Sequence, residues 1–163
     1  MAEALQIRKA CVDDAPAILA VHMRSIRVLC AGHYSSDEIR SWTRHSKVET
    51  YRNAIRGCFE TLYVALLGER VIGFSALATR ELRALYVDPD MAGHGYGKAL
   101  LNATEKFAVN DRMKALYLDA SLNAVHFYQS QGYEILRPAH VELPDGTELP
   151  SLRMKKTLPK RTG

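Results

Sequence analysis

The sequence predicts a single domain of the α/β (α+β) class, with elements in the order β-α-α-β-β-β-α-β-α-β-β. Three observations lead to this class. Two pairs of apolar or β-branched runs are separated by turn residues, as the strands of hairpins are. Between these pairs, a strand enters a glycine-rich loop and then an apolar-periodic helix. The length of 163 residues suits one domain with a hydrophobic core and is short for two.

The first half of the chain is expected to contain a strand, two helices and a hairpin. Ser35 and Glu38 have the spacing of a capping box, so the second helix is expected to begin there. Gly73, inside the last of these strands, indicates a bulge or a close approach of another backbone. The predicted elements are a strand at residues 5–9, a helix from 14 to 29, a second helix through Trp42, and hairpin strands at 60–67 and 71–78.

The second half is organised around residues 82–101. Pro89 has no backbone N–H and disfavours the helical conformation for Asp88, so the strand at residues 82–87 ends there. Apolar side chains recur at helical spacing from Tyr96 onward. The elements expected after this helix are a strand at residues 115–119, a helix at 123–130, and strands at 133–143 and 149–156 joined by a Pro-Asp-Gly turn.

The loop between residues 87 and 98 carries three alternating glycines. Glycine lacks the Cβ atom that would keep an anion away from backbone N–H groups, and the following helix N-terminus adds partial positive charge. The loop therefore favours phosphate binding, with a tight strand-to-helix turn as the alternative. A dinucleotide fingerprint would need glycine at Lys98, and a P-loop would need glycine at Ala92 and a hydroxyl at Ala99, so neither motif fits.

What remains resembles the pyrophosphate loop of the GNAT superfamily of N-acetyltransferases. In that family, Gln/Arg-x-x-Gly-x-Gly/Ala follows a strand ending in Val-x-Pro, and here Ala92-Gly93-His94-Gly95-Tyr96-Gly97 follows Val87-Asp88-Pro89. Ala92 departs from the family's Gln or Arg, so one side-chain contribution at the loop entrance is missing.

Residues 118–133 resemble the second GNAT signature, Asn-x-x-Ala-x-x-Phe/Leu-Tyr-x-x-x-Gly-Phe/Tyr after a strand. Asn123, the pair Phe127-Tyr128 and the pair Gly132-Tyr133 stand at the expected positions, whereas His126 replaces the family's alanine. Both signatures occur in the expected order, one strand apart. The resemblance covers residues 60–156 and makes membership of the GNAT superfamily the expected identity.

This resemblance implies a mixed, mostly antiparallel twisted sheet flanked by helices. It also implies acetyl-coenzyme A as the donor of an acetyl group to a primary amine. A backbone N–H near Leu85 would hold the developing oxyanion, and Asn123 would bond the cofactor's amides, although a helix N-cap explains an asparagine equally well. The residues that the resemblance assigns to the cofactor are Leu85, Tyr86, Val87, Gly93, His94, Gly95, Tyr96, Gly97, Lys98, Asn123 and Tyr128.

Two side chains are candidates for proton transfer. Tyr128 is the candidate general acid, because a phenol of pKa near 10 stays protonated at neutral pH and can protonate a thiolate whose conjugate pKa is about 8.5. Glu81 is the candidate general base, acting directly or through water. The alternatives are a packing role for Tyr128 and a surface ion pair for Glu81. No metal-ligand spacing is present, so no metal is expected.

The acceptor is expected to be a small-molecule or peptide amine, and its identity stays open. His33, Tyr34 and Trp42 lie where the resemblance places the grip on the acceptor, so they are candidates for its pocket. Packing of the two aromatic side chains on an amphipathic helix is the alternative. His22, a lone histidine near an apolar stripe, is interpreted as a core residue.

Composition and charge bear on partners and location. The chain is 47% hydrophobic and 25% charged, which is typical of globular proteins. No apolar run approaches the roughly 20 residues that span a bilayer, so no membrane association is expected. No secretory signal is visible and three irregularly spaced cysteines suit reduced thiols, which favours the cytoplasm.

The net charge of +4 and the pI of about 9.0 suit a polyanionic ligand. Nucleic acid is not an expected partner, because no aromatic and basic patch or recognition helix is present. The basic cluster of Arg153, Lys155, Lys156, Lys160 and Arg161 is interpreted as a solvated end, with contacts to phosphate as the alternative. A non-catalytic coenzyme A sensor remains the alternative function, and a homodimer stays open.

Overall fold

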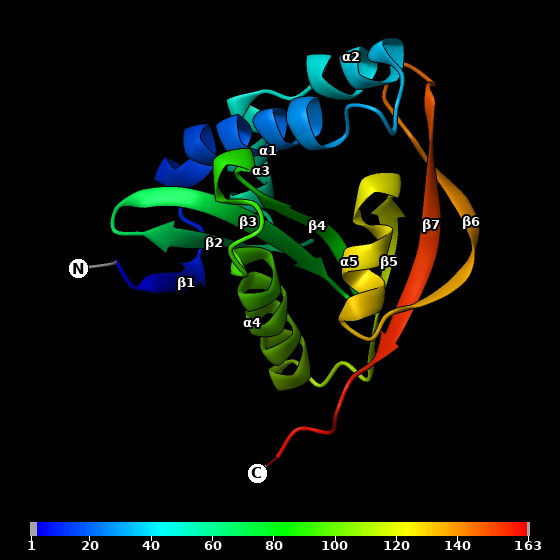
Figure 1. Cartoon of the computed structure of the whole chain (residues 1–163). Coiled ribbons are helices and arrows are strands. Elements are labelled where there is room, and N and C mark those ends of the chain that lie inside the picture. Colours follow the sequence, from blue (N-terminus) through cyan, green and yellow to red (C-terminus); the bar gives the residue numbers. More distant parts are fainter. Residues whose placement is uncertain (1–2, 163) are drawn as a thin grey trace.

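The computed structural model describes residues 3–162, and one seven-stranded sheet forms its centre (Figure 1). The strands are β1 (Leu5–Lys9), β2 (Thr61–Leu67), β3 (Arg70–Ala78), β4 (Glu81–Val87), β5 (Ala115–Ser121), β6 (Glu134–Glu142) and β7 (Glu148–Thr157). Their order across the sheet is β1-β2-β3-β4-β5-β7-β6. Every neighbouring pair is antiparallel except β4 and β5, so the predicted mixed and mostly antiparallel sheet is confirmed.

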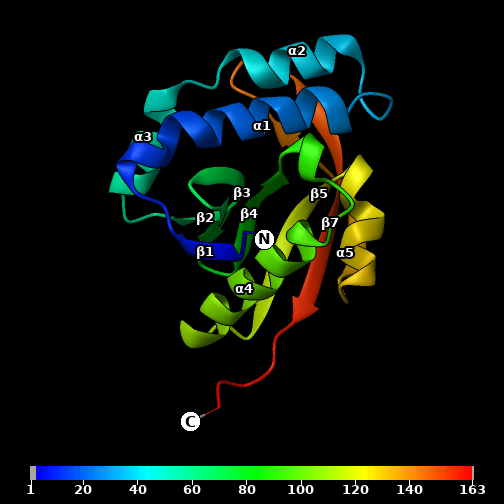
Figure 2. The same ribbon diagram turned by 60° about the vertical axis from the view of Figure 1, so that its left-hand side comes forward.

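Helices cover both faces of this sheet. They are α1 (Ala15–Leu29), α2 (Ser36–Arg44), α3 (Val48–Arg56), α4 (Tyr96–Asn110) and α5 (Val125–Ser130). α1 and α3 pack on one face of β2, β3 and β4, whereas α4 packs on the other face (Figure 1, Figure 2). α5 lies beside β5 and shares a core layer with α4. Within residues 3–162, no helix is long and apolar enough to cross a membrane.

The helix α3 is an addition to the predicted element order. Its N-terminus has no side-chain cap, whereas Ser35 and Glu38 form the predicted capping box at α2. α3 buries Tyr51 against α1 and β3 instead. Tertiary packing therefore stabilises a helix whose local sequence gives no start signal, which is why the sequence analysis missed it.

β4 and β5 pair at one position and then separate. Their parallel register contains Glu81 opposite Tyr117. A register shift in the β3–β4 ladder leaves Arg83 as an extra residue, and such a bulge bends and twists its strand. Within the described part of the chain, the edge of residues 85–87 that faces β5 therefore has no strand partner.

Buried polar contacts hold α4 on the sheet. Thr104 Oγ1 lies 2.8 Å from Ser75 Oγ of β3. Glu105 accepts a hydrogen bond of 3.0 Å from the Tyr133 hydroxyl and one of 2.9 Å from the Lys156 ammonium. These partners satisfy groups that are costly to bury alone. They fix α4, and with it the loop at its N-terminus, at one place on the sheet.

Gly73 is required where β3 passes close to β4. A Cβ atom at this position would lie 2.9 Å from the Tyr86 carbonyl oxygen, closer than van der Waals contact allows. We expect Gly73→Ala to lower the free energy of unfolding by about 1–3 kcal/mol, measured by chemical denaturation. Gly97→Ala is the control, because a Cβ there would meet Phe127 and Val87 at an ordinary 3.7 Å. Equal stability of the two variants would contradict this reading of Gly73.

Candidate active site

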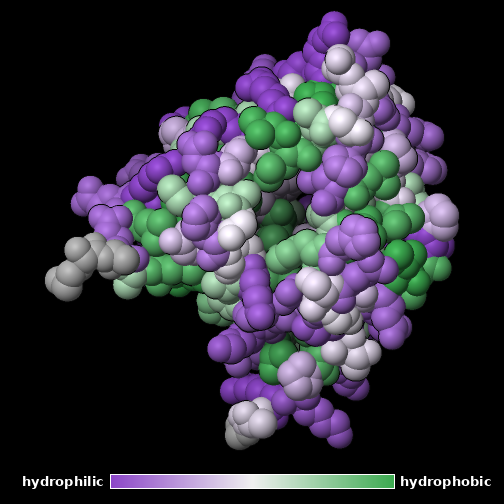
Figure 3. All heavy atoms as spheres, in the orientation of Figure 1, coloured by the Kyte–Doolittle hydropathy of each residue, from purple (hydrophilic) through white to green (hydrophobic). Residues whose placement is uncertain are grey.

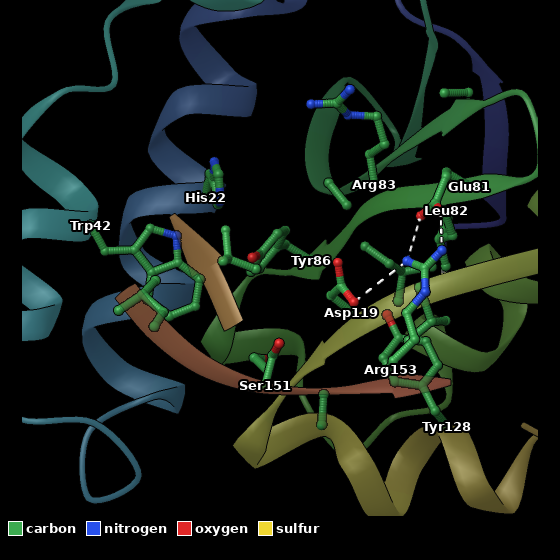
Figure 4. Close-up of a pocket in the computed structure, with 18 of the residues that line it drawn as sticks. His22, Trp42, Glu81, Leu82, Arg83, Tyr86, Asp119, Tyr128, Ser151 and Arg153 are labelled. Carbon is green, nitrogen blue, oxygen red and sulfur yellow. Dashed lines mark hydrogen bonds and ion pairs between the residues drawn. The ribbon is translucent and has the colours of Figure 1, made fainter. Parts of the chain in front are cut away.

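Two cavities meet where β4 and β5 separate. The glycine-loop cavity, of about 480 Å³, lies between the end of α1, β4, the loop before α4, and α5. Figure 3 shows a hollow with a hydrophobic floor at this place. The aromatic cavity, of about 690 Å³, is lined by β4, β5 and β7 with side chains from α1 and α2 (Figure 4). Residues that line both cavities are Leu85, Tyr86, Ser121 and Ala124.

The loop that gives the first cavity its name has two left-handed glycines. Gly93 has φ of 80° and Gly95 has φ of 83°, a region that other residues rarely adopt. A Cβ atom at either position would meet no atom within 4 Å, so the backbone there faces open space. Gly95 is also the N-cap of α4. The loop therefore exposes backbone N–H groups at a helix N-terminus, an arrangement that binds anions.

The loop is tied to α1 by a buried carboxylate. Asp88 is only 5% exposed, and one of its oxygens accepts a 2.9 Å hydrogen bond from the Asp90 backbone N–H. The Arg24 guanidinium of α1 donates to the other oxygen at 2.7 Å. The strand-ending Asp88-Pro89 pair thus fixes the start of the loop as well as the end of β4.

The wall opposite the loop contains Asn123, Cys30 and Ser25. The Cys30 thiol donates to Asn123 Oδ1 at 3.3 Å, and burial raises the pKa of this thiol to about 11. It therefore remains a protonated donor at neutral pH, which turns the amide nitrogen of Asn123 away from Cys30. The Ser25 hydroxyl donates to the Val87 carbonyl, so that main-chain oxygen already has a partner.

Tyr128 of α5 lines the aromatic cavity and is 6% exposed. Its ring packs edge-to-face on Tyr133, with centroids 5.5 Å apart. The pKa of the Tyr128 phenol is raised above its usual value, and burial is the cause of this rise. The phenol is therefore protonated throughout the neutral range and able to donate a proton into this cavity.

Glu81 lies in the same cavity but is bound to Arg153. Arg153 Nη1 donates to Glu81 Oε2 at 3.1 Å, and Nη2 donates to Glu81 Oε1. Arg153 Nη1 also lies 3.4 Å from Asp119 Oδ1 (Figure 4). One guanidinium is thus shared by two carboxylates.

The far end of the aromatic cavity is formed by Tyr34, Trp42 and His22. The Tyr34 hydroxyl donates to the Pro150 carbonyl at 2.6 Å and accepts from the Leu122 backbone N–H at 3.0 Å. This side chain therefore ties the segment before α2 to β7 and to the turn that precedes α5. Trp42 packs edge-to-face on the Tyr34 ring, with centroids 5.3 Å apart.

His22 is a cavity residue as well as a packing residue. Its Nδ1 lies 2.7 Å from the Tyr51 hydroxyl, and its ring centroid lies 4.3 Å from that of Tyr86. Burial lowers the pKa of His22 to about 4, so the imidazole is neutral at pH 7.

Comparison with known proteins identifies the family of this chain. Residues 30–158 match the family model described as the acetyltransferase (GNAT) domain. The chain belongs to the GNAT acetyltransferases. It is 25% identical over 138 residues to an uncharacterized N-acetyltransferase, YafP of Escherichia coli K12, a match that covers 85% of this chain and 87% of that protein.

Solved structures agree with the GNAT assignment. A GCN5-related N-acetyltransferase from Rhodopseudomonas palustris superposes with a TM-score of 0.87 at 28% identity, covering 97% of this chain and 98% of the other. The PaiA N-acetyltransferase of Thermoplasma acidophilum, solved in complex with coenzyme A, gives 0.79 at 25% identity, covering 94% and 99%. This GNAT protein is therefore an acyltransferase of the N-acetyltransferase class.

Most of the predicted site residues of this GNAT domain line one of the two cavities. The predicted residues that line the glycine-loop cavity are Leu85, Tyr86, Val87, Gly93, Gly95, Gly97, Lys98 and Asn123. Those that line the aromatic cavity are Tyr34, Trp42, Glu81 and Tyr128, together with Leu85 and Tyr86, which line both. His33 is exposed and lines neither cavity. His94 is exposed, with Nδ1 3.0 Å from the Ala92 carbonyl oxygen. Tyr96 packs on the core near Ala65 and Leu100 instead.

The structure also brings residues to these two cavities that the sequence did not predict there. Arg153 lies in the cavity wall, so its interpretation as part of a solvated tail was wrong. The alternation of Ser151, Arg153 and Lys155 with Leu152 and Met154 was the available signal, since one face of a strand carries every second residue. His22 and Cys30 gave no such signal, because only the packing of α1 places them at the cavities.

Proposed function

We propose that the protein transfers an acetyl group from acetyl-coenzyme A to a primary amine, with both substrates bound at once. The observation that carries this proposal is the meeting of the two cavities at the split between β4 and β5, with the glycine loop on one side and Tyr128 on the other. The coenzyme A complex of the similar PaiA protein supports it. A small-molecule or peptide amine is the proposed acceptor. We place the reaction in the cytoplasm, because the three cysteines are free.

The glycine-loop cavity fits the diphosphate of coenzyme A. The open space in front of Gly93 and Gly95 lets an anion approach the backbone N–H groups. Lys98 adds a cationic side chain to the same wall. The edge at residues 85–87, which has no strand partner within residues 3–162, would bind the pantetheine arm as an added strand through the main-chain groups that Ser25 leaves free. Asn123 would offer its amide nitrogen to a carbonyl of that arm.

The bound donor supplies a thioester carbonyl that a neutral amine can attack. Backbone N–H groups near Leu85 would donate hydrogen bonds to the carbonyl oxygen as negative charge develops on it, which lowers the barrier because the donors are already in place. Tyr128 would donate its phenolic proton to the departing thiolate. Its buried position keeps that proton available at neutral pH.

Glu81 is the proposed route for the proton that the acceptor ammonium loses. Both of its oxygens are bonded to Arg153, so it receives the proton through water rather than by direct contact. Glu81 also precedes Leu85 by four residues, which is about 13 Å along a strand. A relay is therefore needed on grounds of distance as well.

The proposal is tested by release of free thiol from acetyl-coenzyme A in the presence of a panel of primary amines. We expect release that depends on the acceptor, with the acetylated amine detected by mass spectrometry. Tight binding of acetyl-coenzyme A without acceptor-dependent release would instead support the alternative of a non-catalytic coenzyme A sensor.

Cys30 provides a test of the donor wall. We expect Cys30→Ala to weaken acetyl-coenzyme A binding about three- to tenfold, because Asn123 loses the donor that orients its amide. Cys30→Ser retains a donor, so its dissociation constant should lie closer to that of the wild type. Cys11→Ala is the control, since Cys11 is exposed and lines neither cavity. Unchanged affinity in Cys30→Ala, measured by calorimetry, would remove this role.

A further inference from the structure

One wall of the aromatic cavity carries a row of polar side chains on β5 and β7. Asp119 is paired with Arg153 across the two strands, and Ser121 is paired with Ser151. All four side chains line the cavity. The alternate residues Ala120 of β5 and Met154 of β7 pack into the core on the other face. The polar row is therefore a continuous feature of one face.

The two carboxylates that line this cavity, Glu81 and Asp119, are engaged by cations to different degrees. Arg153 shares its guanidinium between Glu81, which uses both of its oxygens, and Asp119, which contacts it only through Oδ1 at 3.4 Å. Arg83, the other cationic side chain in the wall, is paired with Glu60 at 3.3 Å. Lys155, the next residue on the same face of β7, lies over the Tyr117 ring. Asp119 is thus the carboxylate of this wall that a cation engages least, through one oxygen at 3.4 Å.

Ser151 is a second and independent sign of a missing partner. The residue is 4% exposed, and its Oγ is the buried side-chain atom in residues 3–162 that has no hydrogen-bond partner. Figure 4 shows its hydroxyl pointing into the cavity. Buried hydroxyl groups are normally satisfied, because leaving one without a partner costs free energy. A polar ligand in this cavity would supply the partner.

We propose that Asp119 and Ser151 form a subsite that selects acceptors with a second positive charge. This inference rests on the proposed function. Ser151 is paired with Ser121, and Ser121 lines both cavities. The Ser151 hydroxyl therefore lies level with the place where acceptor and donor would meet. The Ser151 hydroxyl accepts a hydrogen bond from the amine that reacts, and the Asp119 carboxylate binds the second ammonium group.

The register gives the distance between the two charges of the acceptor. Asp119 precedes Ser121 by two residues on β5, which corresponds to about 7 Å, the length of a chain of about four or five methylene groups. An acceptor with a carboxylate at that distance is disfavoured, because Asp119 repels it and Arg153 is already engaged. The proposed acceptor class is thus a linear amine with a terminal cation at this spacing.

The experiment compares three primary amines of equal length, whose far ends carry an ammonium, a hydroxyl or a carboxylate: 1,5-diaminopentane, 5-aminopentan-1-ol and 5-aminopentanoate. We expect wild-type kcat/KM to be roughly tenfold or more higher for the diamine than for the amino alcohol, and lowest for the amino acid. In Asp119→Asn, this ratio of diamine to amino alcohol should fall to about one, and the ratio is the readout because a change in the environment of Glu81 affects both acceptors alike.

Two further variants separate charge recognition from structural damage. Asp37→Asn makes the same chemical change at a side chain that is 91% exposed, and it should leave the ratio unchanged. Ser151→Ala should lower kcat/KM for the diamine and the amino alcohol alike, because its hydroxyl meets the amine common to both. A wild-type enzyme without preference for the diamine, or an Asp119→Asn variant that keeps the preference, would overturn the subsite.

Failure of the proposed function has a different signature. In that case no amine releases thiol from acetyl-coenzyme A, and binding of 1,5-diaminopentane is then measured by calorimetry on the wild type and on Asp119→Asn. Saturable binding that the substitution weakens roughly tenfold would support the subsite without the reaction. Absence of binding, or equal binding by both proteins, would overturn it.

Discussion

Replacing Gly95 with valine is expected to abolish binding of acetyl-coenzyme A. Gly95 has φ of 83°, and its Cβ direction points into open space beside the glycine-loop backbone. A branched side chain there occupies the place where a phosphate must approach the N–H groups, and it resists the left-handed conformation that the N-cap of α4 adopts. We expect the dissociation constant to rise about 100-fold or more, as measured by calorimetry.

Gly146→Val is the matched control for this substitution. Gly146 has φ of 87°, and a Cβ atom there would likewise meet nothing within 4 Å, but it lies in the turn between β6 and β7. Both substitutions should lower the free energy of unfolding by a similar amount, about 1–3 kcal/mol, because each holds a non-glycine residue in the left-handed region. Only Gly95→Val should lose the cofactor. Equal affinities in the two variants would show that the loop backbone does not hold the phosphates.

Replacing Tyr128 with phenylalanine is expected to lower kcat by about 100-fold or more while acetyl-coenzyme A affinity stays unchanged. The substitution removes only the hydroxyl, and the ring remains packed against Phe127 and Tyr133. Without the phenolic proton, the thiolate must leave unprotonated or take a proton from water. Steady-state kinetics and calorimetry on the same preparation separate the two effects.

Tyr133→Phe is the control for loss of a buried tyrosine hydroxyl. The Tyr133 hydroxyl bonds Glu105 under α4 and lies outside both cavities, so this variant should lose stability but little turnover.

Burial raises the pKa of Tyr128, so ionisation of this phenol should not limit the rate until the pH exceeds the usual value of about 10. Full turnover in Tyr128→Phe would assign this side chain to packing alone.

Local sequence signals predicted the elements that carry the proposed donor site. The strand ending at Asp88-Pro89 and the glycines at 93 and 95 set backbone conformations that few other residues allow, so both the end of β4 and the loop were predictable. The two hairpins followed in the same way from their turns. α3 was not predictable, because packing of Tyr51 rather than a cap stabilises it.

The proposed acceptor side depends on contacts between segments far apart in the sequence. Arg153 and Glu81 are 72 positions apart, and only the β4–β5–β7 order brings them together. Lys156, counted with Arg153 in a basic tail, bonds Glu105 instead, because neighbouring residues of a strand point to opposite faces. His33 and Tyr34 are adjacent, yet only Tyr34 faces the cavity. Chain position alone does not reveal such differences.

The central claim is that the bare backbone of the glycine loop binds the diphosphate of acetyl-coenzyme A and directs its thioester toward the aromatic cavity. Isothermal titration of acetyl-coenzyme A into the full chain tests this claim most directly. The account predicts saturable heat with one site per chain, lost when free coenzyme A already occupies the protein. A titration without saturable heat, on protein that is folded, would contradict it.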